Sequence, residues 1–281
     1  MPIARIAAIH DITGIGRCGL SAATPVLSAL GHQVCPLPTA LLSTHPAGFR
    51  DFHLHPLAAD TTAVLAHWAR EEIAFDAFYT GYLCAPTQAD GIAEAAARMR
   101  PGFFLADPVL GDHGRLYSIA DDAMITAMRR LAVAADVITP NLTEAFALLG
   151  EPYRDGPFAP GEAEALAGAL SARFGADCAL KGVAVGTQKM NILFRQSGDC
   201  IAETYIPVPQ SYPGTGDVFA ALLLGVFLHT RDLEGAFRTA TRSTTAMAAH
   251  TYEKKTPPRE GVLIEDFCPS LCTQCNIPTH L

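Results

Sequence analysis

Short apolar segments and longer segments with helical periodicity alternate along almost the whole chain, and this alternation restricts the fold more than any other feature. The short segments predict strands at residues 3–9, 34–37, 77–80, 103–106, 137–139, 178–181, 190–194 and 201–207. The longer segments predict helices at residues 19–30, 61–71, 87–99, 119–132, 141–149, 161–174, 217–228 and 233–249. Nearly continuous apolar strands separated by helices indicate an α/β fold with a mostly parallel sheet covered on both faces.

No helix separates the last two predicted strands. Only Gln196-Ser197-Gly198-Asp199 and a few flanking residues lie between them, which predicts a hairpin and therefore an antiparallel edge to the sheet. No low-complexity linker or repeat divides the chain. We therefore expect one domain over residues 1–262.

A glycine-rich segment, Pro213-Gly214-Thr215-Gly216-Asp217, directly precedes the apolar residues 218–224, which predict a buried helix. A helix start presents unpaired N–H groups and the positive end of the helix dipole, and glycines let an anion approach them. A carboxylate at such a site repels a bound anion, so Asp217 is a candidate general base for attack on phosphorus. The alternative is an ordinary N-cap aspartate.

Polar residues follow several predicted strands, where ligands bind in open α/β sheets. They are Asp11, Thr80-Gly81-Tyr82, the run from Asp107 to Asp112, the run from Thr139 to Glu144, and Lys181-Gly182. Their positions predict one shared cleft.

Three carboxylates in this set, Asp107, Asp112 and Glu144, are of the type that holds the magnesium ion of a nucleotide. Glu144 lies one helical turn beyond Asn141, so these two side chains face the same way. A capping box explains the same pair without a ligand. Lys181 is a candidate for neutralising donor phosphates, although a solvated lysine at a strand end is the simpler interpretation.

A second glycine motif, Gly14-Ile15-Gly16-Arg17-Cys18-Gly19, fits the dinucleotide-binding pattern G-x-G-x-x-G. That pattern requires an acidic residue some 20 positions later, and residues 12–50 contain none. A dehydrogenase is therefore disfavoured, and we interpret the glycines as a tight loop lining the cleft.

The formal net charge of −8 and the lack of a Lys/Arg cluster argue against nucleic acid as a partner. The apolar runs are too short to span a membrane, and no signal-like segment opens the chain, so we expect a cytoplasmic protein.

Three cysteines, Cys268, Cys272 and Cys275, cluster near the end of the chain with a spacing that could hold zinc or an iron–sulfur cluster. The Pro, Thr and Asn content and the absence of a second ligand pair favour a flexible tail over residues 263–281. The other five cysteines are scattered singly and predict reduced thiols.

Three motifs in a fixed order resemble the ribokinase superfamily, within its branch of pyridoxal, pyridoxamine and hydroxymethylpyrimidine kinases. They are Asp107-Pro108-Val109-Leu110-Gly111-Asp112 with Gly114-Arg115-Leu116-Tyr117, then Ile138-Thr139-Pro140-Asn141 with Glu144, and Gly214-Thr215-Gly216-Asp217. The resemblance extends from Ile9 to about Tyr252, and the segment at Tyr117 favours pyridoxal kinases.

This resemblance implies a three-layer αβα fold that binds ATP and Mg²⁺ at the carboxyl edge of the sheet, usually as a homodimer, with K⁺ as a further cation. It implies that Asp217 is the base and that the amides of residues 214–216 form the anion hole. By the same resemblance Asp107, Asp112 and Glu144 serve metal and phosphate, with Thr139 and Asn141 nearby, and Tyr117 covers the donor phosphates. The substrate ring is expected against Tyr82, near Asp11 and His45.

The chain departs from pyridoxal kinases at the ring site, where Asp11 replaces a serine and Pro46 replaces a threonine. The expected reaction is phosphorylation of the 5'-hydroxyl of pyridoxal, pyridoxamine or pyridoxine. Hydroxymethylpyrimidine phosphorylation is the alternative, and a non-catalytic nucleotide or vitamer sensor is a further one.

Overall fold

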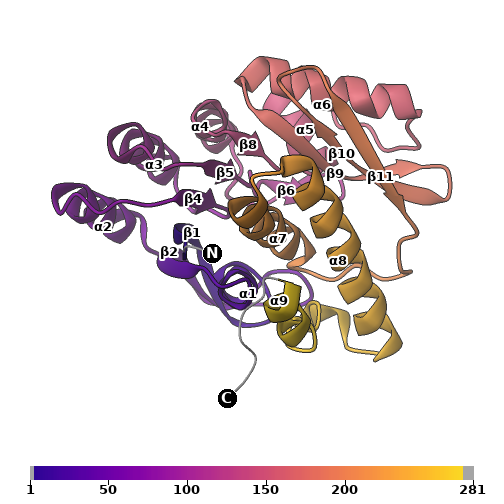
Figure 1. Cartoon of the computed structure of the whole chain (residues 1–281), viewed down its shortest axis with the longest axis horizontal. Helices are drawn as coiled ribbons and strands as arrows, with labels where there is room; N and C mark the ends of the chain where they lie inside the picture. Colours follow the sequence, from indigo (N-terminus) through magenta and orange to yellow (C-terminus); the bar gives the residue numbers. More distant parts are fainter. Residues whose placement is uncertain (1–2, 275–281) are drawn as a thin grey trace.

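A twisted sheet of nine strands runs through the middle of the molecule in the computed structural model, which describes residues 3–274 (Figure 1). The strand order is β11-β10-β9-β8-β5-β4-β1-β2-β3. The strands are β1 (Arg5–Ile15), β2 (Gln33–Thr44), β3 (Leu54–Pro56), β4 (Ala77–Thr80), β5 (Phe104–Ala106), β8 (Val137–Ile138), β9 (Asp177–Val185), β10 (Gln188–Phe194) and β11 (Cys200–Tyr205).

The strands from β2 to β9 pair in parallel, and both edges of the sheet are antiparallel. The expected hairpin is present as β10 and β11, and β10 also pairs antiparallel with β9. A second antiparallel edge, β3 against β2, was not predicted. A three-residue strand is too short to show the alternation by which strands are recognised.

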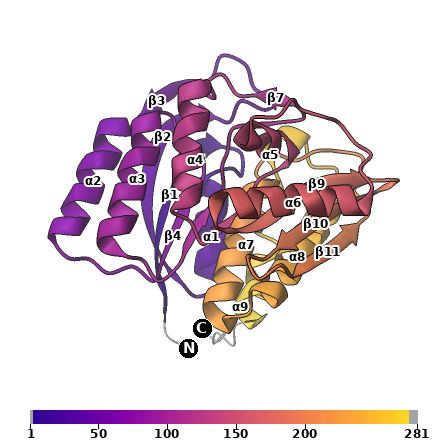
Figure 2. The same cartoon turned by 90° about the horizontal axis from the view of Figure 1, so that it is seen from above.

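Helices cover both faces, so the predicted three-layer αβα architecture is confirmed. One face carries α1 (Leu20–Ala29), α7 (Thr215–Thr230), α8 (Leu233–Glu253) and α9 (Cys268–Gln274). The other carries α2 (Ala58–Arg70), α3 (Pro86–Met99), α4 (Asp122–Val133), α5 (Leu142–Leu149) and α6 (Pro160–Phe174). On this second face α2, α3 and α4 lie side by side (Figure 2).

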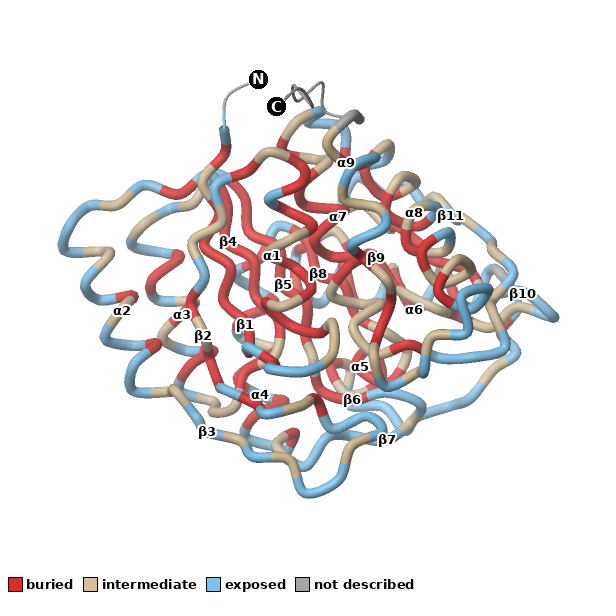
Figure 3. Tube along the Cα trace, turned by 90° about the horizontal axis from the view of Figure 1, so that it is seen from below, coloured by how far each residue is buried: buried red, intermediate tan, exposed pale blue. Residues whose placement is uncertain are grey.

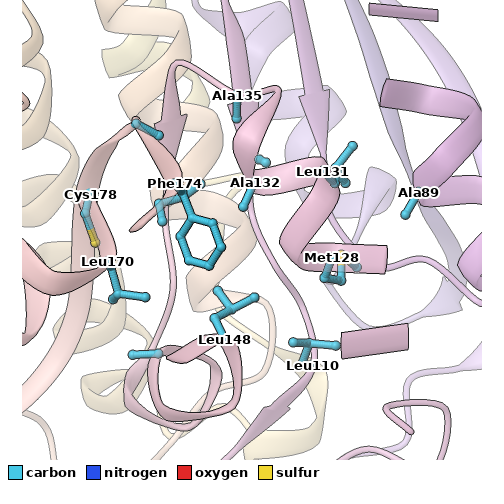
Figure 4. Packing of buried hydrophobic residues seen from close by; sticks show 14 of the residues in the cluster. Ala89, Leu110, Met128, Leu131, Ala132, Ala135, Leu148, Leu170, Phe174 and Cys178 are labelled. Carbon is cyan, nitrogen blue, oxygen red and sulfur yellow. The ribbon is translucent and has the colours of Figure 1, made fainter. Parts of the chain in front are cut away.

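Each face of the sheet has its own hydrophobic cluster, and buried backbone runs through the central strands (Figure 3). On the α2–α6 face, Phe174 and Leu170 pack with Leu148 and Cys178 (Figure 4). On the other face α7 is buried along residues 218–224, as its uniformly apolar sequence predicts.

Strands β1, β2 and β9 are all longer than predicted, and the added length of β1 and β9 changes the position of two candidate residues. Strand β1 continues to Ile15 because it pairs with β2 as far as Thr44, so Asp11 lies inside β1. Strand β9 likewise continues past Lys181 because β10 pairs with it. The placement of both residues after a strand was wrong.

Asp11 and Lys181 nevertheless reach the carboxyl edge of the parallel strands. Ile9 of β1 is level with Thr80, the last residue of β4, so Asp11 lies just beyond that level. Lys181 forms an isolated bridge with Asn141, which follows β8.

The chain between β5 and α4 forms a two-stranded hairpin of β6 (Gly111–Asp112) and β7 (Arg115–Leu116). A short 3-10 helix, η1 (Pro258–Glu260), follows α8. In the part of the C-terminal tail that the structure describes, α9 packs on the α1 face with Leu271 buried and with Cys268 and Cys272 partly buried. Cys275 lies outside the described residues.

Among residues 3–274 no helix combines the length and apolarity needed to cross a membrane.

Candidate active site

The start of α7 is fixed by a glycine in a left-handed conformation. Gly214 is the N-cap with φ 81°, and a Cβ there would lie 1.7 Å from the carbonyl oxygen of Arg17. Only glycine fits such a close approach. A Cβ on Gly216 would come 3.3 Å from Lys181 Nζ, so an ammonium group lies beside this helix start. The first N–H groups of α7 and this ammonium together form a positive environment suited to a phosphate.

Asp217 lies in the first turn of α7 and makes two polar contacts. Its Oδ2 accepts a hydrogen bond from the backbone N–H of Gly19 at 2.6 Å, and its Oδ1 lies 3.2 Å from His10 Nε2. Burial raises the pKa of Asp217, but the positive charge and hydrogen bond of His10, the Gly19 N–H and Lys181 outweigh burial and lower it. Asp217 is therefore ionised, and it is not the N-cap of α7, because Gly214 occupies that position.

His10 was not singled out by the sequence, although it touches the central carboxylate of the site. Its imidazole is buried and packs directly against Gly81, because a Cβ on that glycine would lie 1.9 Å from the ring. Burial lowers the pKa of His10, but Asp217 and Asp11 more than offset this and raise it to about 10. His10 is therefore positively charged near neutral pH.

Asp11 is buried and engaged on both carboxylate oxygens. Its Oδ1 lies 2.7 Å from His10 Nδ1, and its Oδ2 accepts a hydrogen bond from Thr13 Oγ1 at 2.7 Å. Asp11 thus faces His10 and Thr13.

A second group of charges surrounds Lys181. Its Nζ donates to Asp107 Oδ1 at 2.7 Å, and Thr139 Oγ1 donates to the same oxygen at 2.8 Å. Burial lowers the pKa of Lys181, but Asp107, Glu144 and Asp217 outweigh this and raise it. Lys181 therefore stays charged. The structure brings these predicted residues together at the ends of β5 and β8.

Glu144 and Asn141 form the capping box of α5 that the sequence offered as one interpretation. Asn141 Oδ1 accepts from the Glu144 N–H, and Glu144 Oε2 accepts from the Asn141 N–H at 2.7 Å. Glu144 Oε1 accepts from the Leu110 N–H at 3.3 Å. Burial raises the pKa of Glu144 well above its usual value, and the charge of Asp107 adds to this increase.

The chemistry of Asp107 and Glu144 suits magnesium, but only with further ligands from a nucleotide and water. Within residues 3–274 no group of three or more His, Cys, Asp or Glu side chains is arranged to hold a metal ion. Asp107 Oδ2 accepts no hydrogen bond in the described part of the chain. Magnesium commonly binds through one or two carboxylates, substrate phosphates and waters, so the two residues fit that pattern.

Asp112 and Tyr117 lie on and just after the hairpin of β6 and β7. Asp112 is exposed and contacts the adjacent His113. Burial raises the pKa of Tyr117, and so do the charges of Glu144, Asp112 and Asp217. Tyr117 is therefore close to both the Asp217 and the Glu144 sides of the site.

His45 and Tyr82, expected at the substrate ring, lie near the glycine segment and His10. His45 is buried, its Nε2 lies 2.6 Å from the Arg259 carbonyl oxygen, and its Nδ1 has no hydrogen-bond partner in the described structure. Gly16 contacts the same ring, because a Cβ there would lie 2.3 Å from His45 Cδ2. The Tyr82 N–H approaches His10 Nδ1 at 3.2 Å.

The glycine segment at residues 14–19 does not form a single tight loop as expected. Gly14 belongs to β1, whereas Gly16 and Gly19 turn the chain with φ of 100° and 58°. Gly19 then presents its N–H to Asp217. The segment thus contributes to the carboxylate site.

Comparison with known proteins agrees with this geometry. The family model described as phosphomethylpyrimidine kinase matches residues 15–258. The pyridoxal kinase PdxY of Rubrobacter xylanophilus is 30% identical over 270 residues, covering 89% of this chain and 88% of its own length.

Two solved structures are similar over most of the chain. A Bacteroides thetaiotaomicron protein named as a phosphomethylpyrimidine kinase, solved in a form with pyridoxal, has a TM-score of 0.87 and 35% identity, with 96% of each chain covered. Pyridoxal kinase from Leishmania donovani, in complex with ADP and pyridoxamine, has a TM-score of 0.84 and 25% identity, with 95% of each chain covered. The chain therefore has the predicted ribokinase-like fold and belongs to the phosphomethylpyrimidine kinase family, with pyridoxal kinases among its relatives.

Proposed function

We propose that this protein is an ATP-dependent kinase that phosphorylates the 5'-hydroxymethyl group of a vitamin B6 vitamer. The observation on which this proposal rests is the ionised Asp217 in the first turn of α7, beside free helix N–H groups and the Lys181 ammonium. A carboxylate next to a phosphate site is unfavourable for a protein that only binds phosphate. It is useful to a protein that must remove a proton during phosphoryl transfer.

In this reaction Asp217 takes the proton of the substrate hydroxyl as the oxygen attacks the γ-phosphorus of ATP. The bond from the γ-phosphorus to the bridging oxygen breaks, and ADP leaves. The amides of Gly214, Thr215 and Gly216 stabilise the negative charge on the transferred group, with Lys181 beside them. Holding the base and the anion hole on one helix start favours an in-line geometry.

On the donor side, Asp107 and Glu144 would hold Mg²⁺ together with the nucleotide phosphates and water. The ion would neutralise the triphosphate charge. Thr139, Asn141 and Asp112 would lie around the phosphates, and Tyr117 would cover them. Support comes from the chemistry of the two groups, because both are buried carboxylates and Asp107 Oδ2 accepts no hydrogen bond in the described part of the chain.

On the acceptor side, the ring would lie near Tyr82, His45 and Asp11. The unpartnered Nδ1 of buried His45 supports this placement, because the contact of Nε2 with a carbonyl puts the ring proton on Nε2. Nδ1 is then an acceptor for a substrate hydroxyl or amine. Asp11 would act through His10 and not by direct contact with the ring.

A substrate panel tests the function. We expect ADP release from Mg-ATP with pyridoxal, pyridoxamine or pyridoxine as the acceptor, at higher kcat/KM than with hydroxymethylpyrimidine. A higher kcat/KM for hydroxymethylpyrimidine would instead identify the protein as a hydroxymethylpyrimidine kinase of thiamine synthesis. No turnover of any of the four, with ADP binding intact, would favour the sensor alternative. Replacing K⁺ by Na⁺ in the same assay tests the monovalent cation that the family resemblance implies.

We further propose a homodimer, supported by an apolar surface on two neighbouring strands. Ile12 and Ile15 of β1 are 37% and 57% exposed, and Leu41 of β2, paired with Ile12, is 46% exposed. Light scattering should give the mass of two chains, and Ile15→Glu should reduce it to one. Ile206→Glu, at a 75% exposed position beyond β11, is the control and should leave the mass unchanged.

A further inference from the structure

A buried histidine, His10, connects the proposed general base to a second carboxylate. Its Nε2 lies 3.2 Å from Asp217 Oδ1, and its Nδ1 lies 2.7 Å from Asp11 Oδ1. The ring is 1% exposed, so solvent does not compete for either nitrogen. His10 therefore lies between two negative groups.

The proposed reaction creates an electrostatic problem for Asp217. Donor phosphates would bind at the same helix start, and nearby negative charge makes a carboxylate easier to protonate. A protonated Asp217 has no capacity to accept the substrate proton. Lys181 does not solve this problem alone, because its Nζ is bonded to Asp107 at 2.7 Å.

We propose that His10 is a positioning residue whose imidazolium keeps Asp217 ionised while phosphate is bound, and that Asp11 keeps His10 protonated. This inference rests on the proposed kinase function and assigns roles to two residues that do not transfer the phosphoryl group.

The hydrogen-bond geometry supports a charged ring. Each ring nitrogen faces a carboxylate oxygen, and a neutral imidazole has only one N–H to donate. The backbone N–H groups of Asp11 and Tyr82 also approach Nδ1, at 2.9 and 3.2 Å, which favours a lone pair there. A full carboxylate charge at 2.7 Å outweighs these weaker dipoles.

The other groups around His10 are uncharged, so the two carboxylates determine whether its imidazole is protonated. Tyr79 of β4 lies with its ring centroid 5.9 Å away, and burial raises its pKa well above the usual value. Burial also raises the pKa values of Cys18, which precedes α1, and Tyr82. These three groups are neutral at physiological pH, and Thr13 contributes no charge.

Replacement of His10 by glutamine tests the role, because glutamine can donate a hydrogen bond but cannot carry a charge. We expect the acidic limb of the kcat–pH profile in His10→Gln to move to higher pH by about one unit or more. Asp11→Asn should move the limb in the same direction by less, and it serves if His10→Gln does not fold. The control is His32→Gln, a buried histidine bonded to the Gly225 carbonyl, whose limb should match that of wild type. If the acidic limb of the kcat–pH profile has the same midpoint in His10→Gln and in wild type, the proposal is wrong.

Nuclear magnetic resonance supplies a readout that needs no turnover. With ¹⁵N-labelled histidine, we expect one imidazole at pH 8.5 to have both nitrogens protonated and to disappear in His10→Gln. With ADP and magnesium added at pH 6, the ¹³C carboxyl signal of Asp217 should be that of a carboxylate in wild type. The same signal should move toward the acid form in His10→Gln.

The two proposals fail in different ways. Absence of vitamer turnover with a doubly protonated His10 removes the kinase function and leaves the charge assignment intact. Vitamer turnover with a neutral His10 at pH 7 keeps the kinase function and removes the positioning role of His10.

Discussion

The two charged clusters of the site place one cation among two carboxylates, but they differ in how that cation is shared. His10 contacts both Asp217 and Asp11. The Lys181 ammonium donates to Asp107 and to no other side chain within residues 3–274, while Glu144 accepts from backbone N–H groups. The pKa of Asp217 is accordingly lowered, whereas the pKa values of Asp107 and Glu144 are raised.

This difference indicates that the two clusters have different functions. The His10 cluster contains enough positive charge to keep its base ionised before any ligand arrives. In the described part of the Lys181 cluster the ammonium donates to one of the two carboxylates, and burial raises the pKa values of both, so a metal-bound nucleotide would add a second positive charge there. One cluster is therefore suited to proton transfer and the other to cation and phosphate binding.

The largest expected effect comes from Asp217→Asn. The asparagine can still accept from the Gly19 N–H but cannot take a proton, so we expect kcat to fall by about 10²- to 10⁴-fold. ADP binding, measured by calorimetry, should change little because the Lys181 cluster is intact. Near-wild-type turnover would remove Asp217 from the mechanism and end the division between the clusters.

Lys181→Met should destabilise the fold strongly because it leaves Asp107 buried without its partner. Breaking a buried ion pair on one side costs about 3–5 kcal/mol. The loss, measured by urea unfolding at pH 7, should shrink toward pH 5, where the carboxyl groups with raised pKa values take up protons. The double variant Lys181→Met/Asp107→Asn should recover part of the loss. If the loss in free energy of unfolding of Lys181→Met were the same at pH 5 and pH 7, the carboxyl groups around Lys181 would not be short of positive charge.

The phosphate side of the site could be predicted because its residues directly follow short apolar segments that the sequence identifies as strands. Asp107, Thr139 and Asn141 each follow a short apolar strand, and parallel strands bring such positions to one edge. The alternation of strands and helices predicted the fold correctly, and the resemblance of the three motifs predicted the family correctly.

The base side could be predicted only in part. His10 stands in an apolar strand, where a histidine resembles a satisfied core residue, and its partner Asp217 is 207 residues away. Its orientation also depends on the register shift between His10 and Ile12, which no local pattern encodes. Asp11 and Lys181 were misplaced because strand length depends on the neighbouring strand.

The dependence of stability on pH should distinguish the clusters. The pKa of His10 is raised from 6.5 to about 10, so its stabilising contribution is complete below pH 6.5 and is lost as pH rises through 10. The free energy of unfolding of wild type minus that of His10→Gln should therefore decline between pH 7 and 10, by at least about 1 kcal/mol. The corresponding difference for Lys181→Met should change mainly below pH 7. A flat His10 difference would mean that the ring is neutral in the folded protein.

The smallest expected effect comes from the packing that holds His10 in place. A Cβ on Gly81 would lie 1.9 Å from Cδ2 and Nε2 of the imidazole, so Gly81→Ala must displace the ring from Asp217. Overpacking of this kind costs about 1–3 kcal/mol, and the lost contact should also lower kcat and move its acidic limb upward. Gly91→Ala in α3 is the matched control, because its Cβ would meet only Thr62 Oγ1 at 3.9 Å and alanine favours a helix. If Gly81→Ala unfolds at a lower urea concentration but keeps the wild-type pH profile, the base does not depend on the position of His10, and the two clusters differ in composition rather than in function.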